Sequence, residues 1–182
     1  MIYYLYGCPH SGKTTLANNI KKLWTNKEII IVPDFARTHI KSLGTRALTK
    51  DEQEYLYTLS IGLSWIHSEF SKNDNVIVIN DFSPLTTGFY LNRIRAMNRD
   101  DKDQIYGHMR RDKVGILWCK KLPNYEQGDG RQFNEDESTI IETQMGNFYD
   151  RVTYEEAFTQ HMFDINNREE KLIQIGKEYG YV

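Results

Sequence analysis

The sequence predicts an α/β fold in which helices cover both faces of a parallel β-sheet. Short apolar runs alternate along the chain with helical patterns, which is typical of parallel sheets. The runs are almost continuously apolar, as expected for strands buried on both faces. A glycine-rich motif joins the first run to the first helical pattern. The expected strands are residues 2–6, 28–32, 75–80, 114–119 and about 158–165.

Four helices are expected around these strands. The first covers about residues 13–24 and begins at the glycine-rich motif. Apolar residues at alternating steps of three and four predict a long helix over residues 51–71. A third helix is expected to begin near Thr139, because Thr139 and Glu142 have the spacing of a capping box. The last covers about residues 168–179.

Length, charge and cysteine content limit the class of protein. The 182 residues are enough for one domain with a sizeable core, so we expect a single domain over residues 1–182. The formal net charge of -2 argues against a protein that coats nucleic acid. The chain has two cysteines, Cys8 and Cys119. So few cysteines make a disulfide framework improbable and favour a cytoplasmic setting. We expect neither a membrane span nor an N-terminal targeting segment.

The motif G-x-x-x-x-G-K-T lies between a predicted strand and a predicted helix. Glycines let backbone amides surround an anion, and the N-terminus of the helix adds a partial positive charge. We expect Lys13 to reach the β- and γ-phosphates of ATP and the Thr14 hydroxyl to bind Mg²⁺. The motif in this context predicts an ATP-binding phosphate loop. Its residues are Gly7, Cys8, Pro9, His10, Ser11, Gly12, Lys13, Thr14 and Thr15.

Acidic residues follow two of the predicted strands. Asp81 comes directly after the third strand, where a carboxylate can bind Mg²⁺ or accept the proton of an attacking hydroxyl, or can cap a helix. Asp34 follows the second strand and can orient or deprotonate an acceptor, and Arg37 can hold an anionic group. The same pair also fits a helix cap and a solvated arginine. We predict Asp34, Arg37 and Asp81 as residues that bind substrate, and Thr14 and Asp81 as metal ligands.

A polar, turn-rich segment follows the fourth strand, at the end of the sheet where α/β proteins bind ligands. We interpret residues 122–136 as a lid that closes over the site. Arg131 in this segment is a candidate for stabilising the transferred phosphoryl group. Lys120 and Lys121, just before the lid, are weaker candidates for the same role. The predicted catalytic residues are therefore Lys13, Asp34, Asp81 and Arg131.

Taken together, these motifs resemble the kinase domain of NadR-type ribosylnicotinamide kinases and their P-loop relatives. The similar features are the phosphate loop, Asp34 with Arg37 three residues later, Asp81 followed by Thr86-Thr87, and Asp129-Gly130-Arg131. The resemblance extends from residue 1 to about 168 and departs at Ser83, where the family often has a second acid. It implies a P-loop NTPase three-layer sandwich with five parallel strands in the order 2-3-1-4-5.

The expected function is an Mg²⁺- and ATP-dependent kinase that phosphorylates a hydroxyl of a small nucleoside- or nucleotide-like acceptor. A nucleoside monophosphate kinase stays open, with Arg37 and either Arg93 or Arg95 as the clamp for the acceptor phosphate. A hydroxymethylated base in DNA is a further acceptor, disfavoured by the net charge. A nucleotide-hydrolysing switch is the alternative from another class. The compact form resembles stand-alone phage members of the group, for which the setting would be the host cytoplasm.

Overall fold

Parallel strands and surrounding helices alternate along the chain, as the sequence predicts. The computed structural model describes residues 1–9, 11–44, 48–111, 114–122, 133–153, 159–163 and 167–182. The five strands are β1 (Ile2–Tyr6), β2 (Glu28–Val32), β3 (Val76–Asn80), β4 (Val114–Cys119) and β5 (Thr159–Phe163). The described helices are α1 (Lys13–Leu23), α2 (Phe35–Ser42), α3 (Lys50–Ser71), α4 (Pro84–Ile94), α5 (Arg99–Arg111), α6 (Glu135–Thr153) and α7 (Arg168–Glu178).

The strands form one sheet with the order β2-β3-β1-β4-β5, and every pair of neighbours is parallel. The strand order implied by the family resemblance is therefore confirmed. Because β1 lies between β3 and β4, the loops that follow β1 and β3 open at the same edge of the sheet. Ligands bind at such an edge in open α/β sheets. The phosphate loop and Asp81 are therefore brought together by the topology.

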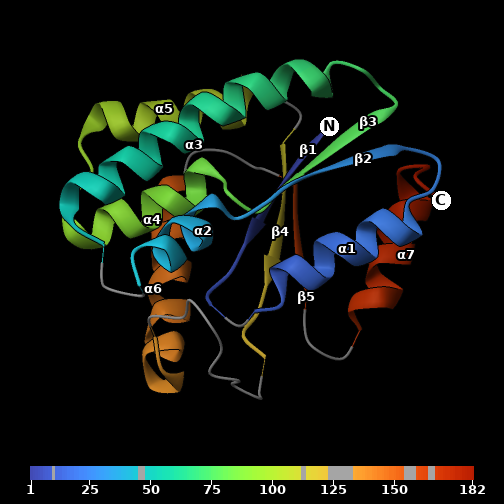
Figure 1. Ribbon diagram of the computed structural model, residues 1–182. Helices are drawn as coiled ribbons and strands as arrows, with labels where there is room; N and C mark the ends of the chain where they lie inside the picture. The colour runs from blue at the N-terminus through green and yellow to red at the C-terminus, as the bar shows by residue number, and fades with distance from the viewer. Residues whose placement is uncertain (10, 45–47, 112–113, 123–132, 154–158, 164–166) are drawn as a thin grey trace.

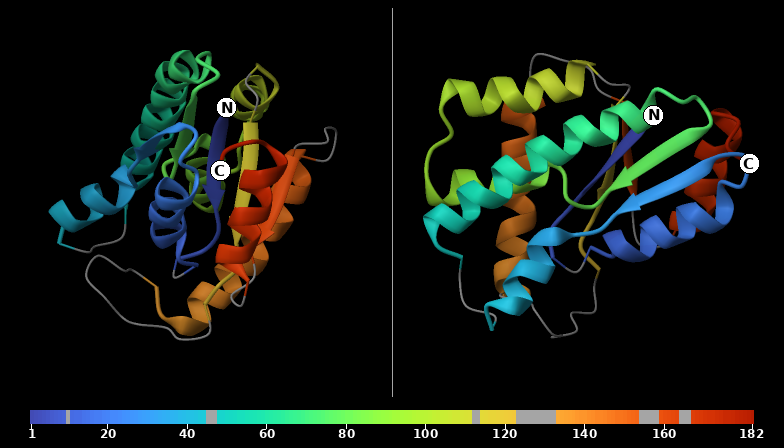
Figure 2. Two further views of the ribbon diagram at one scale, coloured as in Figure 1. Left: turned by 90° about the vertical axis from the view of Figure 1, so that its right-hand side faces the viewer. Right: turned by 45° about the horizontal axis from the view of Figure 1, so that its top comes forward.

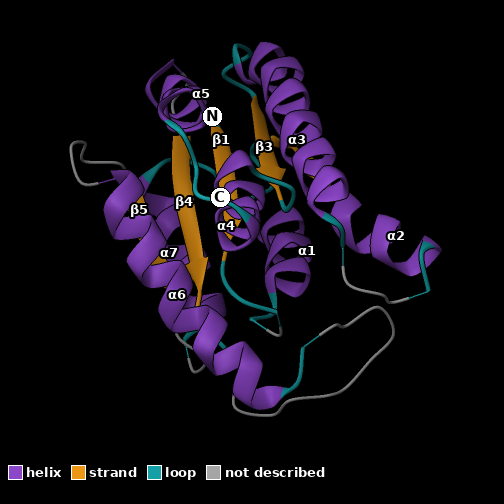
Figure 3. Ribbon diagram, turned by 90° about the vertical axis from the view of Figure 1, so that its left-hand side faces the viewer, coloured by secondary structure: helices purple, strands orange, loops and turns teal. Residues whose placement is uncertain are grey.

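Helices cover both faces of the sheet and make a three-layer sandwich. Helices α1 and α7 lie together on one face, and α3, α4, α5 and α6 lie on the other (Figure 1; Figure 2). In Figure 3 the strands are enclosed between these layers. None of the described helices combines the length and the apolar character needed to cross a membrane.

The central strand β1 is buried along its whole length and supplies aromatic rings to both layers. Tyr4 and Tyr6 face the larger helical layer, where the Tyr6 hydroxyl donates to the backbone oxygen of Met145 at 2.8 Å. Tyr3 faces the other layer and packs against the rings of Trp24 and Tyr181. Alternate residues of a strand point to opposite faces, so a five-residue strand anchors both cores.

Helix boundaries agree with the sequence pattern where the pattern was strong. Helix α1 ends one residue before the predicted boundary, and α3 begins one residue earlier, behind a capping box of Thr49 and Glu52. The prediction of a helix start at Thr139 was wrong. Helix α6 begins at Glu135, where Asn134 and Glu137 exchange reciprocal side-chain bonds with each other's backbone N–H groups. Glu142 instead accepts a bond from the backbone N–H of Lys121 at 2.7 Å.

The capping box of α3 gives a direct test of these helix boundaries. We expect Thr49→Ala to lower the free energy of unfolding by about 1 kcal/mol, because it removes the acceptor of the Glu52 backbone N–H. Thr58→Ala is the matched control, since Thr58 is exposed in the middle of the same helix. Urea unfolding followed by circular dichroism measures both. Equal stability of the two variants would contradict the assigned cap.

Candidate functional site

The phosphate loop runs from the end of β1 to the start of α1 and depends on two glycines with positive φ. Gly7 has φ 147° and Gly12 has φ 70°, and Gly12 is the N-cap of α1. A Cβ atom on Gly7 would collide with the backbone oxygen of Cys119 in β4. The loop therefore passes too close to the neighbouring strand for any other residue. His10 lies outside the described residues.

Lys13 is buried and folded against the loop that precedes it. Its Nζ donates to the backbone oxygens of Gly7 at 2.8 Å and Cys8 at 3.1 Å, and to Ser11 Oγ at 3.4 Å. These bonds satisfy the three N–H groups of the ammonium and hold its charge inside the loop. The positive charge and the N-terminus of α1 thus favour an anion at the same position.

Asp81 lies opposite the phosphate loop, at the end of β3. The Thr14 hydroxyl donates to Asp81 Oδ2 at 3.1 Å, while the buried Oδ1 has no hydrogen-bond partner among the described residues. Burial raises the pKa of this carboxyl to about 6, against the opposing effect of the Lys13 charge. The carboxylate is therefore placed where a cation would be strongly favoured.

The alternative role for Asp81, a helix cap, is excluded by its neighbour. Ser83 is the N-cap of α4, and its Oγ accepts a bond from the Thr86 backbone N–H at 3.2 Å. Pro84 occupies the first helical position, where its missing N–H costs nothing. The carboxylate of Asp81 is consequently not used for capping. Ser83, the position at which the sequence departs from the ribosylnicotinamide kinase pattern, therefore caps α4.

Thr14 and Asp81 fit a magnesium ion. Mg²⁺ prefers oxygen ligands and usually takes only one or two from the protein, the rest coming from water and substrate phosphates. A hydroxyl and an unpaired carboxylate oxygen at the phosphate loop meet that requirement. The described residues contain no group of three His, Cys, Asp or Glu side chains that could enclose a metal ion by themselves. Both proposed ligands therefore belong to a site that substrate phosphates would complete.

Asp34 caps a helix, and both Asp34 and Arg37 also face the candidate site. Asp34 is the N-cap of α2, and its Oδ1 accepts a bond from the Arg37 backbone N–H at 3.2 Å. Its Oδ2 lies 3.7 Å from Arg37 Nε. Both side chains also line the cavity beside the phosphate loop. A cap at the carboxyl end of a strand thus places a carboxylate and a guanidinium next to each other at the site.

The cavity has a volume of about 520 Å³ and joins the phosphate loop to α2, α3 and α4. The polar side chains on its wall come from helices α1 to α4 and from the loops that follow β1, β2 and β3. Its aliphatic and aromatic wall is formed by α2, by α4 and by residues of the connecting segments. Its described lining residues are Gly7, Pro9, Ser11, Gly12, Lys13, Thr14, Thr15, Asp34, Ala36, Arg37, Ile40, Leu48, Gln53, Asp81, Phe82, Thr86, Thr87, Tyr90, Arg93, Ile94 and Phe133.

Gln53 and Tyr90 line the cavity and were not predicted, and Phe133, which also lines it, was predicted only as part of the lid over residues 122–136. Gln53 is buried in α3, and its Nε2 donates to the backbone oxygen of Thr87 at 3.3 Å. A polar residue on the buried face of a helix is the sequence signal that would have indicated it. Tyr90 and Phe133 stack with their ring planes 11° apart. Nothing in the sequence pattern joins these two residues, because they are 43 positions apart.

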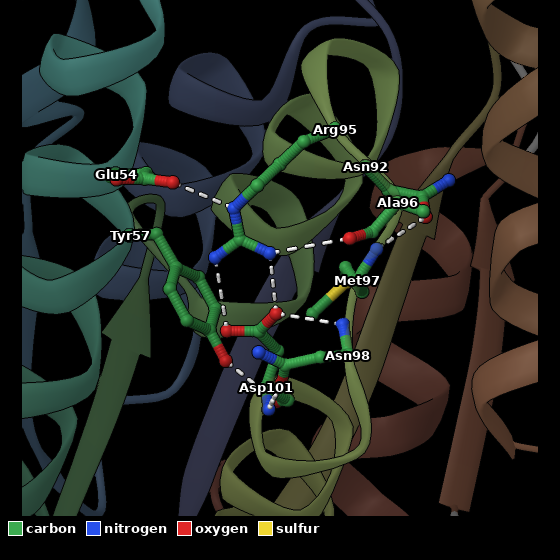
Figure 4. Close-up of polar contacts among 8 residues, drawn as sticks. All are labelled: Glu54, Tyr57, Asn92, Arg95, Ala96, Met97, Asn98 and Asp101. Atoms are coloured by element: carbon green, nitrogen blue, oxygen red, sulfur yellow. Dashed lines mark hydrogen bonds and ion pairs between the residues drawn. The ribbon is translucent and has the colours of Figure 1, made fainter.

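Other predicted residues lie elsewhere. Arg131 and most of the predicted lid fall outside the described residues. Lys121 Nζ donates to Thr139 Oγ1 at 2.9 Å and is not on the cavity wall. The suggestion that Arg95 clamps an acceptor phosphate is wrong. Figure 4 shows its guanidinium bound by carboxylates, with Arg95 Nε 2.7 Å from Glu54 and Nη1 2.7 Å from Asp101.

Arg168 at the start of α7 is a further residue missed by the sequence reasoning. Its Nη1 donates to the backbone oxygen of Ser11 at 2.8 Å, and Nη2 donates to that of Lys120 at 3.0 Å. A Cβ on Gly12 would lie 2.6 Å from Nη1, so the guanidinium rests directly on the phosphate loop. This side chain connects the loop, the end of β4 and the C-terminal helix.

The sequence profile described as AAA domain matches residues 2–161. The chain belongs to this family. No curated protein sequence matches the chain. The match covers most of the described site, from the phosphate loop through the cavity-lining residues of α4.

Solved structures agree on the fold. Deoxyadenosine kinase from M. mycoides with bound dATP gives a TM-score of 0.60 at 13% identity, with 100% of both chains covered. The same enzyme with bound dCTP gives 0.51 at 15% identity, covering 98% of this chain and 100% of that one. Similarity at this level of identity concerns the fold. The P-loop kinase fold is confirmed, whereas the narrower relation to ribosylnicotinamide kinases stays a prediction.

The raised pKa of Asp81 predicts that the free energy of unfolding depends on pH. Between the ordinary value of 3.8 and about 6, the folded state holds a proton that the unfolded state has lost, so stability falls as pH rises through that window. We expect Asp81→Asn to be more stable than the original chain by ~3 kcal/mol at pH 7.

The gain of Asp81→Asn should shrink towards pH 4, because the carboxyl of the original chain is then largely protonated. Asparagine keeps an acceptor for the Thr14 hydroxyl, which makes the substitution nearly isosteric. Urea unfolding with a chelator present, at pH 4 and pH 7, measures the difference. An asparagine variant that is less stable at pH 7 would contradict the assigned environment.

Proposed function

We propose that the chain is an ATP-dependent kinase that transfers the γ-phosphate to a hydroxyl of a nucleoside- or nucleotide-like acceptor. The observation that carries the proposal is the cavity itself, in which one continuous wall holds both the phosphate loop and the Asp34–Arg37 pair. A phosphate donor at the loop and an acceptor at the pair would therefore meet in one enclosed space. The proposed kinase domain covers residues 1–182, with a lid at about 122–136.

The roles of the side chains follow from their contacts. Lys13 would stabilise negative charge on the β- and γ-phosphates, since its ammonium already lies inside the loop. Thr14 and Asp81 would hold Mg²⁺, which when bound neutralises phosphate charge and orients the phosphates for in-line attack. Arg131 remains the proposed lid residue that stabilises the transferred group.

Asp34 is the better candidate for general base. Asp81 Oδ2 already accepts the Thr14 hydroxyl, and the second oxygen of Asp81 suits the metal. In the proposed reaction the acceptor oxygen bonds to the γ-phosphorus as the bond from that phosphorus to the β–γ bridging oxygen breaks. ADP leaves, and the hydroxyl proton passes to the Asp34 carboxylate. Closure of the cavity would exclude water, which is the competing acceptor.

The competing proposal is a nucleotide-hydrolysing switch. A hydrolase of this type would use an acidic residue directly after Asp81, at the end of the third strand. Here that residue is Phe82, which is buried and packs against the Phe35 ring at 5.5 Å between centroids. This packing supports a structural role at that position and favours transfer over hydrolysis.

The kinase proposal is tested by ATP consumption with Mg²⁺ across nucleosides, nucleoside monophosphates, nicotinamide riboside and hydroxymethylated DNA. We expect consumption only with one acceptor class, and at least a ~100-fold loss in Lys13→Ala, because the loop then lacks its fixed charge. Lys21→Ala, on the exposed side of the same helix, is the matched control. Hydrolysis of ATP that is independent of every acceptor would overturn the kinase assignment.

Asp34→Asn separates the role of the carboxylate in catalysis from its role in capping. Asparagine caps helices as well as aspartate does, so the free energy of unfolding should stay unchanged. The amide cannot accept the acceptor's proton, so we expect kcat to fall by about 100-fold or more while the Kd for ATP changes little. Steady-state kinetics and calorimetry measure these quantities. Unchanged kcat would remove Asp34 from the proposed mechanism.

A further inference from the structure

Two arginines at the end of α4 are two residues apart and have opposite environments. Arg95 uses its guanidinium fully, with bonds to Glu54, Asp101 and the backbone oxygen of Ala96 (Figure 4). Arg93 lines the cavity, lies 5.5 Å above the Phe133 ring, and makes no hydrogen bond or ion pair with any described residue. A guanidinium has five N–H donors in a fixed plane, which suits it to binding an anion with several oxygens.

The charges that the described residues place on the cavity wall leave Arg93 without a counterion among them. Among the described residues the wall carries Lys13, Arg37 and Arg93 against Asp34 and Asp81. Lys13 belongs to the phosphate loop, and Arg37 is already beside Asp34. The remaining positive charge favours an anionic group in the acceptor half of the cavity.

Both arginines act on the same part of the wall. The charges of Arg93 and Arg37 each lower the pKa of Tyr90, which burial and Asp34 otherwise raise. Tyr90 thus lies within electrostatic range of both guanidinium groups. Two guanidinium groups converging on one region can grip an anion with several oxygens better than either alone.

The anion site and the reaction site are separated along α4. Asp81 precedes the first turn of this helix, whereas Arg93 lies in its last turn, nine residues or about 14 Å beyond Pro84 at 1.5 Å per residue. The carboxylates near the loop would repel a second anion but accept a neutral hydroxyl. An acceptor with a hydroxyl at one end and a negative charge at the other complements this arrangement.

The wall between these two ends suits a flat, apolar group. Tyr90 and Phe133 present aromatic surface, and Ile40 and Leu48 present aliphatic surface to the same cavity. Aromatic and apolar side chains of this kind bind nucleobases by stacking and apolar contact. Gln53, held by its bond to Thr87, adds an amide at the same wall. A base, a hydroxyl and an anion together describe a nucleotide.

We propose that the acceptor is a nucleotide whose phosphate is held by Arg93 with support from Arg37, while its hydroxyl faces Asp34. The inference rests on the proposed kinase function and specifies its substrate class. It excludes a nucleoside without phosphate as the preferred acceptor. The nucleotide can be free or part of a strand, because the recognised chemistry is the same.

The experiment compares deoxynucleosides with their 5′-monophosphates and with short single-stranded oligonucleotides, using the full chain with MgATP. We expect kcat/KM for a nucleotide to exceed that for the matching nucleoside by about 100-fold. Arg93→Ala should reduce this preference by about 10- to 100-fold, because kcat/KM should fall more for the nucleotide than for the nucleoside. Activity with monophosphates would show that the acceptor is a free nucleotide. Activity only with oligonucleotides would show that the acceptor nucleotide is part of a strand.

Control variants and a binding measurement make the test specific. Arg93→Lys should restore part of the preference, and Arg99→Ala, which removes a highly exposed arginine of α5, should change nothing. Calorimetry with a monophosphate and no ATP should show weaker binding to Arg93→Ala than to the original chain. A nucleoside used as well as its monophosphate, or equal losses for both in Arg93→Ala, would overturn the inference.

The same assay distinguishes failure of the two proposals. A kinase that uses nucleosides and monophosphates equally keeps the proposed function and loses the nucleotide clamp. If no acceptor in the assay causes ADP to form, both the kinase proposal and the nucleotide proposal fail. Mass spectrometry of the product adds a third criterion, since the inference requires a new phosphate on a hydroxyl. A nucleoside diphosphate would show that the acceptor phosphate itself attacks, and would overturn the proposed orientation.

Discussion

The hydrogen bond between Thr14 and the buried carboxylate of Asp81 joins the two parts of the site, and the other features are arranged around it. It links the first turn of α1 to the end of β3, and it can form because β1 and β3 are adjacent parallel strands. Burial disfavours the charged carboxylate, so a positive neighbour is needed. The Lys13 ammonium supplies part of that charge, and the Mg²⁺ proposed to bind Thr14 and Asp81 would supply the rest.

Because the Asp81 carboxylate must face the phosphate loop, the two residues after it take the other local roles. The chain turns from β3 into α4 within three residues, and the helix needs a cap. Ser83 provides the cap, so Asp81 is free to face the loop, and Phe82 fills the core between them. Three consecutive positions thus serve the site, the core and the helix. Exchanging any two of these tasks would leave a carboxylate unpaired or a helix uncapped.

The fold could be predicted from sequence because its signals are local. Apolar runs, the glycine motif and helical periodicity each depend on residues within a few positions of one another. The failures depend on distant contacts. Both 134–137 and 139–142 have capping-box spacing; the helix begins at the first, which forms its reciprocal bonds, whereas Glu142 binds the Lys121 backbone N–H, 21 positions away. Arg93 and Arg95 differ only because Glu54 and Asp101 lie beside one of them.

The contact of Arg168 with the phosphate loop has a consequence for the order of events during synthesis. The bond from Arg168 to Ser11 spans 157 positions, and Trp24 at the end of α1 similarly bonds the Leu172 backbone oxygen, 148 positions away. Because a ribosome delivers the N-terminus first, the glycine loop emerges long before the residues that brace it. A nascent chain would therefore carry the loop sequence without its final support, and would gain that support only after α7 has emerged.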